Sequence, residues 1–225
     1  MNSLAINGKR MKNYNRSITI VVSLLLFWLV MTDAFAINPS VFKAYNLKHG
    51  VVIRLPKHWQ IIESQLMDQI DTNTEIYTGV GQGNNDILMA ANFYDGRTKA
   101  PAASARVSVR VKQTASQSDI AAMSQADLEA EANQAYQATL AAMMKSGDKI
   151  TRITPYKILK DNLSGYIAMR SDYQEIGAEY ISNVSIYLVC LGNKIVKVTL
   201  SFNDTQASLL TPTIDEIKNS IQIKE

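Results

Sequence analysis

Hydrophobic and polar residues follow the clearest pattern between positions 184 and 202, on both sides of Gly192 and Asn193. After this pair, Val196 begins a series in which every second residue is apolar and the residues between are polar. A period of two indicates a β-strand with one buried face. Before the pair, residues 184–191 are apolar at nearly every position, which is typical of a strand covered on both faces. Since Gly192-Asn193 fits a two-residue turn whose first residue has a positive φ, the stretch predicts a β-hairpin.

The same two patterns predict further strands along the chain. A β-branched run follows Gly50 and ends at Pro56, and an apolar run covers 87–94. Residues 105–112 alternate, so we expect Ala105, Val107, Val109 and Val111 to point inward and Arg106, Ser108, Arg110 and Lys112 to form a solvated face. Two segments, 149–160 and 163–173, complete an antiparallel meander with the hairpin, because their connections are short.

Two segments predict helices. Ser124 and Asp127 have the spacing of a capping box, and an alanine-rich segment follows with an apolar stripe made of Leu128, Ala132, Tyr136, Leu140, Met143 and Met144. Near the end of the chain, Leu210, Ile214, Ile217 and Ile221 have helical spacing, and Pro212 suits a first helical turn. Together the elements predict an α+β domain. We expect an αβα sandwich, in which an antiparallel β-sheet of about six strands packs against a long central helix and a C-terminal helix.

The first 36 residues have the three parts of a secretory signal peptide. An apolar run covers 18–31, Ala34-Phe35-Ala36 is an A-x-A cleavage site, and the basic part contains Lys9, Arg10, Lys12 and Arg16. The alternative is an uncleaved membrane anchor, but this run rises only about 21 Å as a helix, against a hydrocarbon core of roughly 30 Å. We therefore expect cleavage after Ala36 and a single domain over residues 37–225, in the periplasm or secreted. Translation could begin at Met1 or at Met11, which also precedes a compact basic region.

Loss of residues 1–36 changes the charge of the chain. The segment carries four of the 23 Lys and Arg residues and one of the 20 Asp and Glu residues, which leaves 19 of each. A neutral domain argues against nucleic acid as a partner. Because Cys190 is the only cysteine, the chain has no intramolecular disulfide and no lipid-anchor cysteine at the cleavage point. Its stability must come from its core, and a chain of this length buries roughly 70% of its unfolded surface.

The order of the elements resembles that of a known fold family. Its features are a strand ending in Leu55-Pro56-Lys57-His58-Trp59, a long helix, Gly165 inside a four-strand meander, and an amphipathic helix ending in Ser220-Ile221-Gln222-Ile223. This order is similar to that of the PsbP and Mog-type family, which includes DcrB-like bacterial envelope proteins. The resemblance covers nearly the whole mature chain and implies an αβα sandwich and a non-catalytic accessory role. It implies no site residues, because the chain shows no site motif of the family.

Few residues form a recognisable catalytic or metal-binding pattern. His49 and His58 are nine residues apart, which is not a zinc-ligand spacing, so we expect no metal site. The glycines at 79, 81 and 83 superficially resemble a phosphate-binding loop, but a helix and a suitably placed lysine are missing, and a hairpin loop is favoured. Cys190 lies in register with the apolar residues of its predicted strand, which favours a buried, unreactive thiol over a nucleophile.

One charged feature is a candidate binding surface. Arg106, Arg110 and Lys112 project from one face of one predicted strand. They could protect an exposed sheet edge by charge. Alternatively, they form the site for an acidic partner, and we expect any partner-binding surface to include them.

These observations predict an exported, non-catalytic binding or accessory protein of the bacterial cell envelope that acts through protein contacts and needs no cofactor. Two alternatives stay open. One is a periplasmic small-ligand carrier with a cleft between the long helix and the sheet, and the other is a hydrolase with a dispersed site. A pocket with a few convergent polar groups would distinguish these two from the first.

Overall fold

The computed structural model describes residues 41–62, 85–96, 100–146, 150–177 and 180–224, and contacts within the chain group Phe42–Glu225 into one compact unit. The predicted signal peptide and the glycines at 79, 81 and 83 lie outside the described residues. Cleavage after Ala36 therefore stays a prediction.

The main sheet is antiparallel and, within the described residues, has eight strands. Seven follow one another across the sheet: β3 (Gln60–Ile61), β4 (Asn85–Phe93), β5 (Ala103–Val111), β10 (Lys194–Asn203), β9 (Ile181–Cys190), β8 (Tyr166–Gly177) and β6 (Ile150–Ile153). The eighth, β7 (Lys157–Leu163), also pairs with β8. The α+β class and the antiparallel sheet are confirmed. The strands outnumber the six expected because the predicted segment 149–160 forms two strands, β6 and β7, and because β3 is too short to show a period.

The predicted hairpin is confirmed as β9 and β10. Its turn contains Gly192 with φ of 79°, and Cys190 pairs with Ile195. On its other side, β10 pairs along its length with β5, from Lys194 opposite Val111 to Phe202 opposite Ala103. The hairpin therefore lies in the middle of the sheet.

A second, three-stranded sheet contains β1 (Phe42–Asn46), β2 (Val51–Pro56) and β11 (Gln222–Ile223). A short 3-10 helix, η3 (Lys48–Gly50), leads into β2, where Gly50 has φ of 74°. A Cβ at Gly50 would lie 2.7 Å from the carbonyl oxygen of Lys224, so the close approach of the C-terminal strand requires glycine here. The sequence pattern does not predict β11, because two residues show no period.

One face of the main sheet forms the hydrophobic core. It packs against β2 and against helix α5 (Ala207–Ser220), which follows the short η4 (Asp204–Gln206) and contacts both β10 and β2. Fully buried side chains from these elements include Ile53, Leu55, Val107, Val109, Val189, Val196, Val198 and Ile217. Helix α5 begins at Ala207, so Pro212 lies inside it; the expectation that Pro212 occupies the first turn is wrong.

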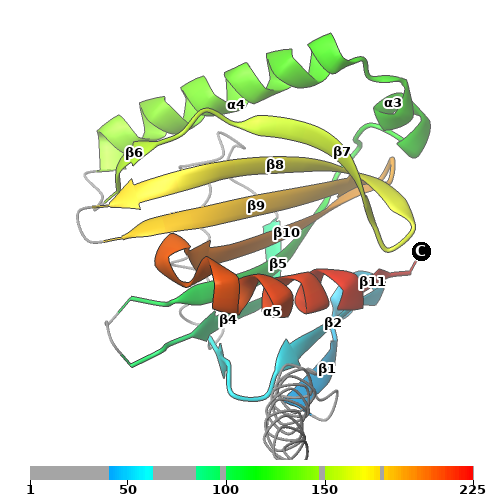
Figure 1. Cartoon of the computed structure of the whole chain (residues 1–225). Helices are drawn as coiled ribbons and strands as arrows, with labels where there is room; N and C mark the ends of the chain where they lie inside the picture. The colour runs from blue at the N-terminus through cyan, green and yellow to red at the C-terminus, as the bar shows by residue number, and fades with distance from the viewer. Residues whose placement is uncertain (1–40, 63–84, 97–99, 147–149, 178–179, 225) are drawn as a thin grey trace, which may run out of the picture. The chain divides into compact units, whose positions relative to one another are not determined.

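The opposite face carries the other two helices, α3 (Gln117–Ala122) and α4 (Gln125–Ser146). Figure 1 shows α4 above β8, and it shows α5 on the opposite side of the sheet from α4. This is the predicted layering. The capping box of α4 is confirmed: the amide of Ser124 donates to Asp127 Oδ2 at 2.7 Å, and the amide of Asp127 donates to Ser124 Oγ at 3.2 Å. Leu128 and Ala132 bury the first half of α4 against Ile158 of β7.

Candidate functional site

A cavity of about 180 Å³ lies between α4 and the main sheet. We call it the helix–sheet cavity; Ala135 and Thr139 of α4 line one side, and Leu188 and Lys197 of the sheet line the other. It lies on the face of the sheet opposite the hydrophobic core, because Leu188 and Lys197 alternate with the core residues Val189 and Val196. This is the cleft that the small-ligand alternative requires.

The cavity exists because small side chains face each other. Ala135 and Thr139 are one helical turn apart, so both point from α4 in the same direction. The sheet contributes Ser108 from β5 and Ser171 from β8. None of these four side chains is long enough to fill the space over the middle of the sheet, where larger residues would close a core.

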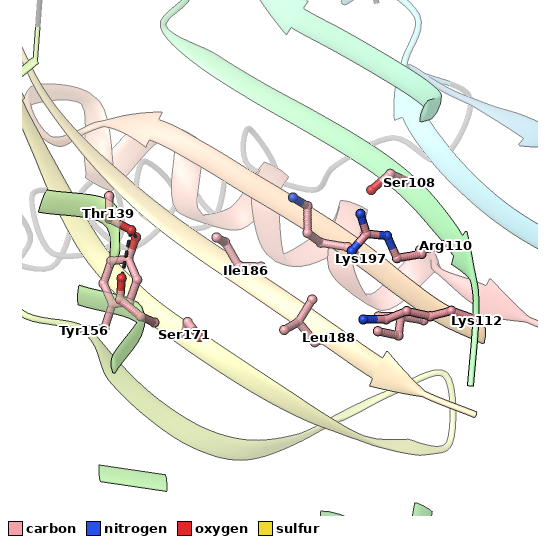
Figure 2. Close-up of a pocket in the computed structure, with 11 residues that line it drawn as sticks. Ser108, Arg110, Lys112, Thr139, Tyr156, Ser171, Ile186, Leu188 and Lys197 are labelled. Atoms are coloured by element: carbon pink, nitrogen blue, oxygen red, sulfur yellow. Dashed lines mark hydrogen bonds between the residues drawn. The ribbon is translucent and has the colours of Figure 1, made fainter. Parts of the chain in front are cut away.

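Three cations gather at one end of the cavity. They are Arg110 of β5, Lys112, which directly follows β5, and Lys197 of β10 (Figure 2). Lys197 pairs with Ser108, so it is the diagonal neighbour of Arg110 at a Cβ separation of roughly 7–8 Å. Arg110 is only 9% exposed, Lys197 is half-buried and Lys112 is exposed.

The middle of the cavity is apolar. Ile186 and Leu188 lie between the cations and the opposite end in Figure 2, and Ile195 lies next to Arg110 in the strand pairing. Water bound here would find few hydrogen-bond partners. An apolar group is therefore the preferred occupant of this part of the cavity.

Hydroxyl groups close the other end. Tyr156 OH lies 2.8 Å from Thr139 Oγ1, and Thr139 Oγ1 also donates to the carbonyl of Ala135 at 3.0 Å. The rings of Tyr156 and Tyr173 lie 4.4 Å apart, and Tyr173 OH donates to Glu175 Oε1 at 3.3 Å. Burial raises the pKa of Tyr156, and it raises that of Tyr173 well above the usual value. Both phenols are therefore neutral donors at physiological pH.

Arg106 lies on the same face of β5 but does not line the cavity. Burial lowers the pKa of its guanidinium, while Glu175 and Tyr173 raise it. Because Arg106 interacts electrostatically with Glu175 and Tyr173, it lies beyond the hydroxyl end of the helix–sheet cavity. The structure thus separates Arg106 from Arg110 and Lys112, which both line the cavity.

The expectation of a solvated face on this strand is wrong. β5 lies between β4 and β10 and is no edge strand, so edge protection does not explain its cations. Arg110 is buried, whereas Val111, which was expected to point into the core, is 58% exposed at the end of the strand. A role of Arg106, Arg110 and Lys112 in binding an acidic partner stays a prediction, and Lys112 is the exposed member of the three.

Sequence reasoning missed three residues of the site. Thr139 follows Leu128, Ala132 and Ala135 on the same face of α4 at spacings of four, three and four, but its polarity excluded it from the apolar stripe. Lys197 alternates with apolar residues, so the pattern placed it on a solvent-exposed face of the sheet. Tyr156 lies in the connection after β6, where no period exists to place it.

The other candidate residues, His49, His58 and Cys190, make contacts typical of residues that maintain the fold. His49 Nε2 lies 3.7 Å from Asp86 Oδ2, and the ring of His58 meets the ring of Phe93 edge-on at 5.4 Å. Within the described parts of the chain, no three His, Cys, Asp or Glu side chains are grouped so that they could hold a metal ion. Cys190 is 4% exposed, and its carbonyl accepts a hydrogen bond of 2.9 Å from Gln117 Nε2.

A second, more polar depression of about 470 Å³ lies beside α5. Its charged residues neutralise one another: Lys218 Nζ donates to Asp161 Oδ2 at 2.8 Å, and Arg170 Nε donates to Asp172 Oδ1 at 2.9 Å. The Tyr187 ring lies between the two cations, 5.7 Å from the Arg170 guanidinium carbon and 5.2 Å from Lys218 Nζ. The contacts of Lys218 attach α5 to β7 and β9 and need no ligand.

No helix of the described residues is both long and apolar enough to cross a membrane.

Comparisons with known proteins give low similarity throughout. No family model and no curated protein matches the chain. Among solved structures, it is similar to the cyanobacterial PsbP (CyanoP) of Synechocystis sp. PCC 6803, with 11% identity, 84% of this chain and 96% of that chain covered, and a TM-score of 0.48. It is also similar to LpqN of Mycobacterium tuberculosis, described as involved in cell envelope biogenesis, with 9% identity, coverage of 84% and 88%, and a TM-score of 0.42.

Proposed function

We propose that the mature chain is an exported, non-catalytic binding or accessory protein of the cell envelope, and that it binds a small ligand in the helix–sheet cavity. The observation that carries this proposal is the lining of the cavity, which has polar groups at both ends and apolar side chains between them. Such a combination of apolar walls and a few placed polar groups is typical of ligand sites.

The cavity favours ligand binding over a role that depends on protein contacts alone. Arg110 and Thr139 are buried, so they are accessible to a molecule that enters the cavity and not to a flat protein surface. Size favours a small ligand, since a cavity of about 150 Å³ accommodates benzene. A molecule with one aromatic ring or a short alkyl chain fits the volume of this cavity.

The arrangement does not favour a hydrolase. The described lining contains no histidine, cysteine or carboxylate that could act as a nucleophile or general base. Its serines, Ser108 and Ser171, have no such base beside them in that lining. The groups present can bind and orient a molecule.

Filling the cavity tests the proposal. Ala135→Leu adds three carbon atoms to the cavity wall, and Ala130→Leu makes the same change at an exposed position of α4. The mature protein is isolated from the envelope fraction of its own cells and weighed by native mass spectrometry. We expect a small-molecule adduct on the wild type and on A130L that is absent from A135L. An adduct that A135L retains, or its absence from all three proteins, would contradict ligand binding in this cavity.

A further inference from the structure

The polar depression beside α5 contains a buried phenol whose hydroxyl group has no partner. Tyr187 of β9 is 4% exposed and lines the depression. Its ring contacts the cations of Arg170 and Lys218, but within the described parts of the chain its hydroxyl makes no hydrogen bond. A buried donor that stays unpaired is unfavourable. We propose that this hydroxyl binds a ligand in the depression, and that the ligand is a free sugar or polyol, a small neutral molecule with several hydroxyl groups.

The Tyr187 hydroxyl is accessible from the depression. In the described part of the chain, the side-chain oxygen and nitrogen atoms that are fully buried without a partner are Asn92 Oδ1, Arg106 Nε and Arg110 Nε. The Tyr187 oxygen has no partner and is not one of these atoms, so it keeps some accessible surface. The little of Tyr187 that is exposed therefore includes its polar tip, and a molecule in the depression can reach it.

The phenol carries its proton at physiological pH. Burial raises the pKa of Tyr187 to about 12; Arg170 opposes this shift, and Asp161, Asp172 and Asp215 reinforce it. A neutral phenol both donates and accepts hydrogen bonds. The hydroxyl of a sugar or polyol does the same, so the two groups can pair in either direction.

The charges around the depression balance, which favours a neutral ligand. Its described lining contains the cations Lys157, Arg170 and Lys218 and the carboxylates Asp172 and Asp215. Asp161 adds a third carboxylate, because it accepts from Lys218 Nζ at 2.8 Å and lies 3.5 Å from Arg170 Nη1. With three charges of each sign, the depression has no net charge that would select an anion or a cation.

The lining recognises a ligand by hydrogen bonds and not by stacking. The Tyr187 ring already contacts two cations and is buried, so it offers no free face to an aromatic ligand. Thr211 and Asp215 of α5 and Lys157 of β7 are exposed in the lining, and together they supply donors and acceptors for several hydroxyl groups. The volume of about 470 Å³ lies in the range of small-molecule sites, roughly 300–1,000 Å³.

Neutral probes test the proposal. The protein is expressed from its full sequence with isotope labels and titrated with sorbitol, glucose and N-acetylglucosamine, each at millimolar concentrations, while NMR spectra are recorded. We expect at least one of the three to shift the amide resonances of Tyr187, Asp172 and Thr211. Ala135→Leu, which fills the helix–sheet cavity on the other face of the sheet, should leave this binding unchanged. The result is therefore independent of the proposed function.

A matched series tests the neutrality of the ligand. Gluconate and glucamine have the hydroxylated six-carbon chain of sorbitol, but one end is a carboxylate or an ammonium group. We expect sorbitol to bind at least as tightly as either charged analogue. Tighter binding of gluconate or glucamine would overturn the assignment of a neutral ligand.

Tyr187→Phe tests the hydroxyl, because it keeps the ring that contacts Arg170 and Lys218. We expect this variant to weaken binding of the neutral probe about fivefold, which corresponds to the loss of one ordinary hydrogen bond. Tyr45→Phe makes the same change on β1, in the other sheet, and should have no effect. Asp215→Asn, at an exposed position of α5, is a second variant of the depression that leaves the buried residues intact and should also weaken binding.

Two results would overturn the proposal outright. One is the absence of shifts at the depression with all three neutral probes, which would mean that only water meets the Tyr187 hydroxyl. The other is unchanged binding by both Y187F and D215N, which would place the probe elsewhere on the protein.

Discussion

The hydroxyl groups of Thr139 and Tyr156, 2.8 Å apart, connect the long helix α4 to the chain segment between β6 and β7. Thr139 is only 2% exposed, so this contact is shielded from water. It fixes the hydroxyl end of the helix–sheet cavity and holds the helix away from the sheet at that end.

Removal of this hydrogen bond should lower stability. Thr139→Val keeps the shape of the side chain, and we expect it to lower the free energy of unfolding by about 1 kcal/mol. Tyr156→Phe should do the same, and the double variant should lose less than the sum of the two. Urea denaturation measures all three. Thr211→Val, at an exposed position of α5, is the control. Losses of unfolding free energy that simply add in the double variant at Thr139 and Tyr156 would contradict the contact.

Tyr187 should make the protein sensitive to high pH. The side chain is 4% exposed, and burial raises its pKa to about 12, although Arg170 opposes the shift. An unfolded tyrosine ionises near pH 10, so between about pH 10 and 12 the unfolded state loses this proton while the folded state keeps it. Stability should therefore be complete below pH 10 and fall as the pH rises through that window.

Tyr187→Phe removes the ionisable group at this position. We expect the fall in unfolding free energy between pH 9 and 11 to be shallower in this variant, as measured by urea denaturation at each pH. Tyr156 and Tyr173 also have raised pKa values, so some dependence on pH should persist. An unchanged slope would show that Tyr187 ionises equally in both states.

Cys190 should react slowly in the native protein. Its thiol lies on the cavity face of β9, in register with Leu188, but it is 4% exposed and does not line the cavity. Labelling with a thiol reagent should be slow until denaturant is added, because the reagent needs an accessible thiolate. Ala121→Cys in a Cys190→Ser background places a thiol at an exposed site of α3 and should react at once. Fast native labelling of Cys190 would contradict its burial.

Gly50 should tolerate no side chain. Gly50 and Gly165 both have positive φ, 74° and 84°, so alanine is strained at either position. Only at Gly50 would the added Cβ approach other atoms, whereas the space around Gly165 is open. We expect G165A to lower the unfolding free energy by about 1 kcal/mol and G50A to lower it further. Equal losses would show that the close approach of Lys224 has no energetic effect.

Export should remove the first 36 residues. We expect the protein from a periplasmic or extracellular fraction to begin at Ile37, because Ala34 and Ala36 form the A-x-A site. N-terminal sequencing of that fraction measures this directly. Ala36→Phe should block cleavage at this position, and a wild-type protein that still carries residues 18–31 in the membrane would contradict the prediction.

The sequence predicts the elements of this fold better than their surroundings. The period of two around Gly192 places β9 and β10, because each strand repeats its face over many residues. That period cannot show whether the polar face is covered. Arg110 and Lys197 lie on such a face, and helix α4 covers it. The pattern within β5 or β10 carries no information on that helix. Thr139 was missed for the related reason that its hydroxyl is satisfied by Tyr156, a contact that forms only in the folded chain.

The pairing of β2 with β11 has a consequence for the time at which the protein can fold. Val51 pairs with Ile223, so β2, which has β1 on its other side, meets this second partner only when the last residues of the chain are available. Contacts between such distant segments form late, since the entropy of closing the long loop must be overcome first. If the predicted signal peptide exports the chain, its fold therefore stays incomplete until the C-terminal residues have crossed the membrane. Val51, Ile53 and Leu55, which have no exposed surface in the finished protein, are accessible to chaperones until then.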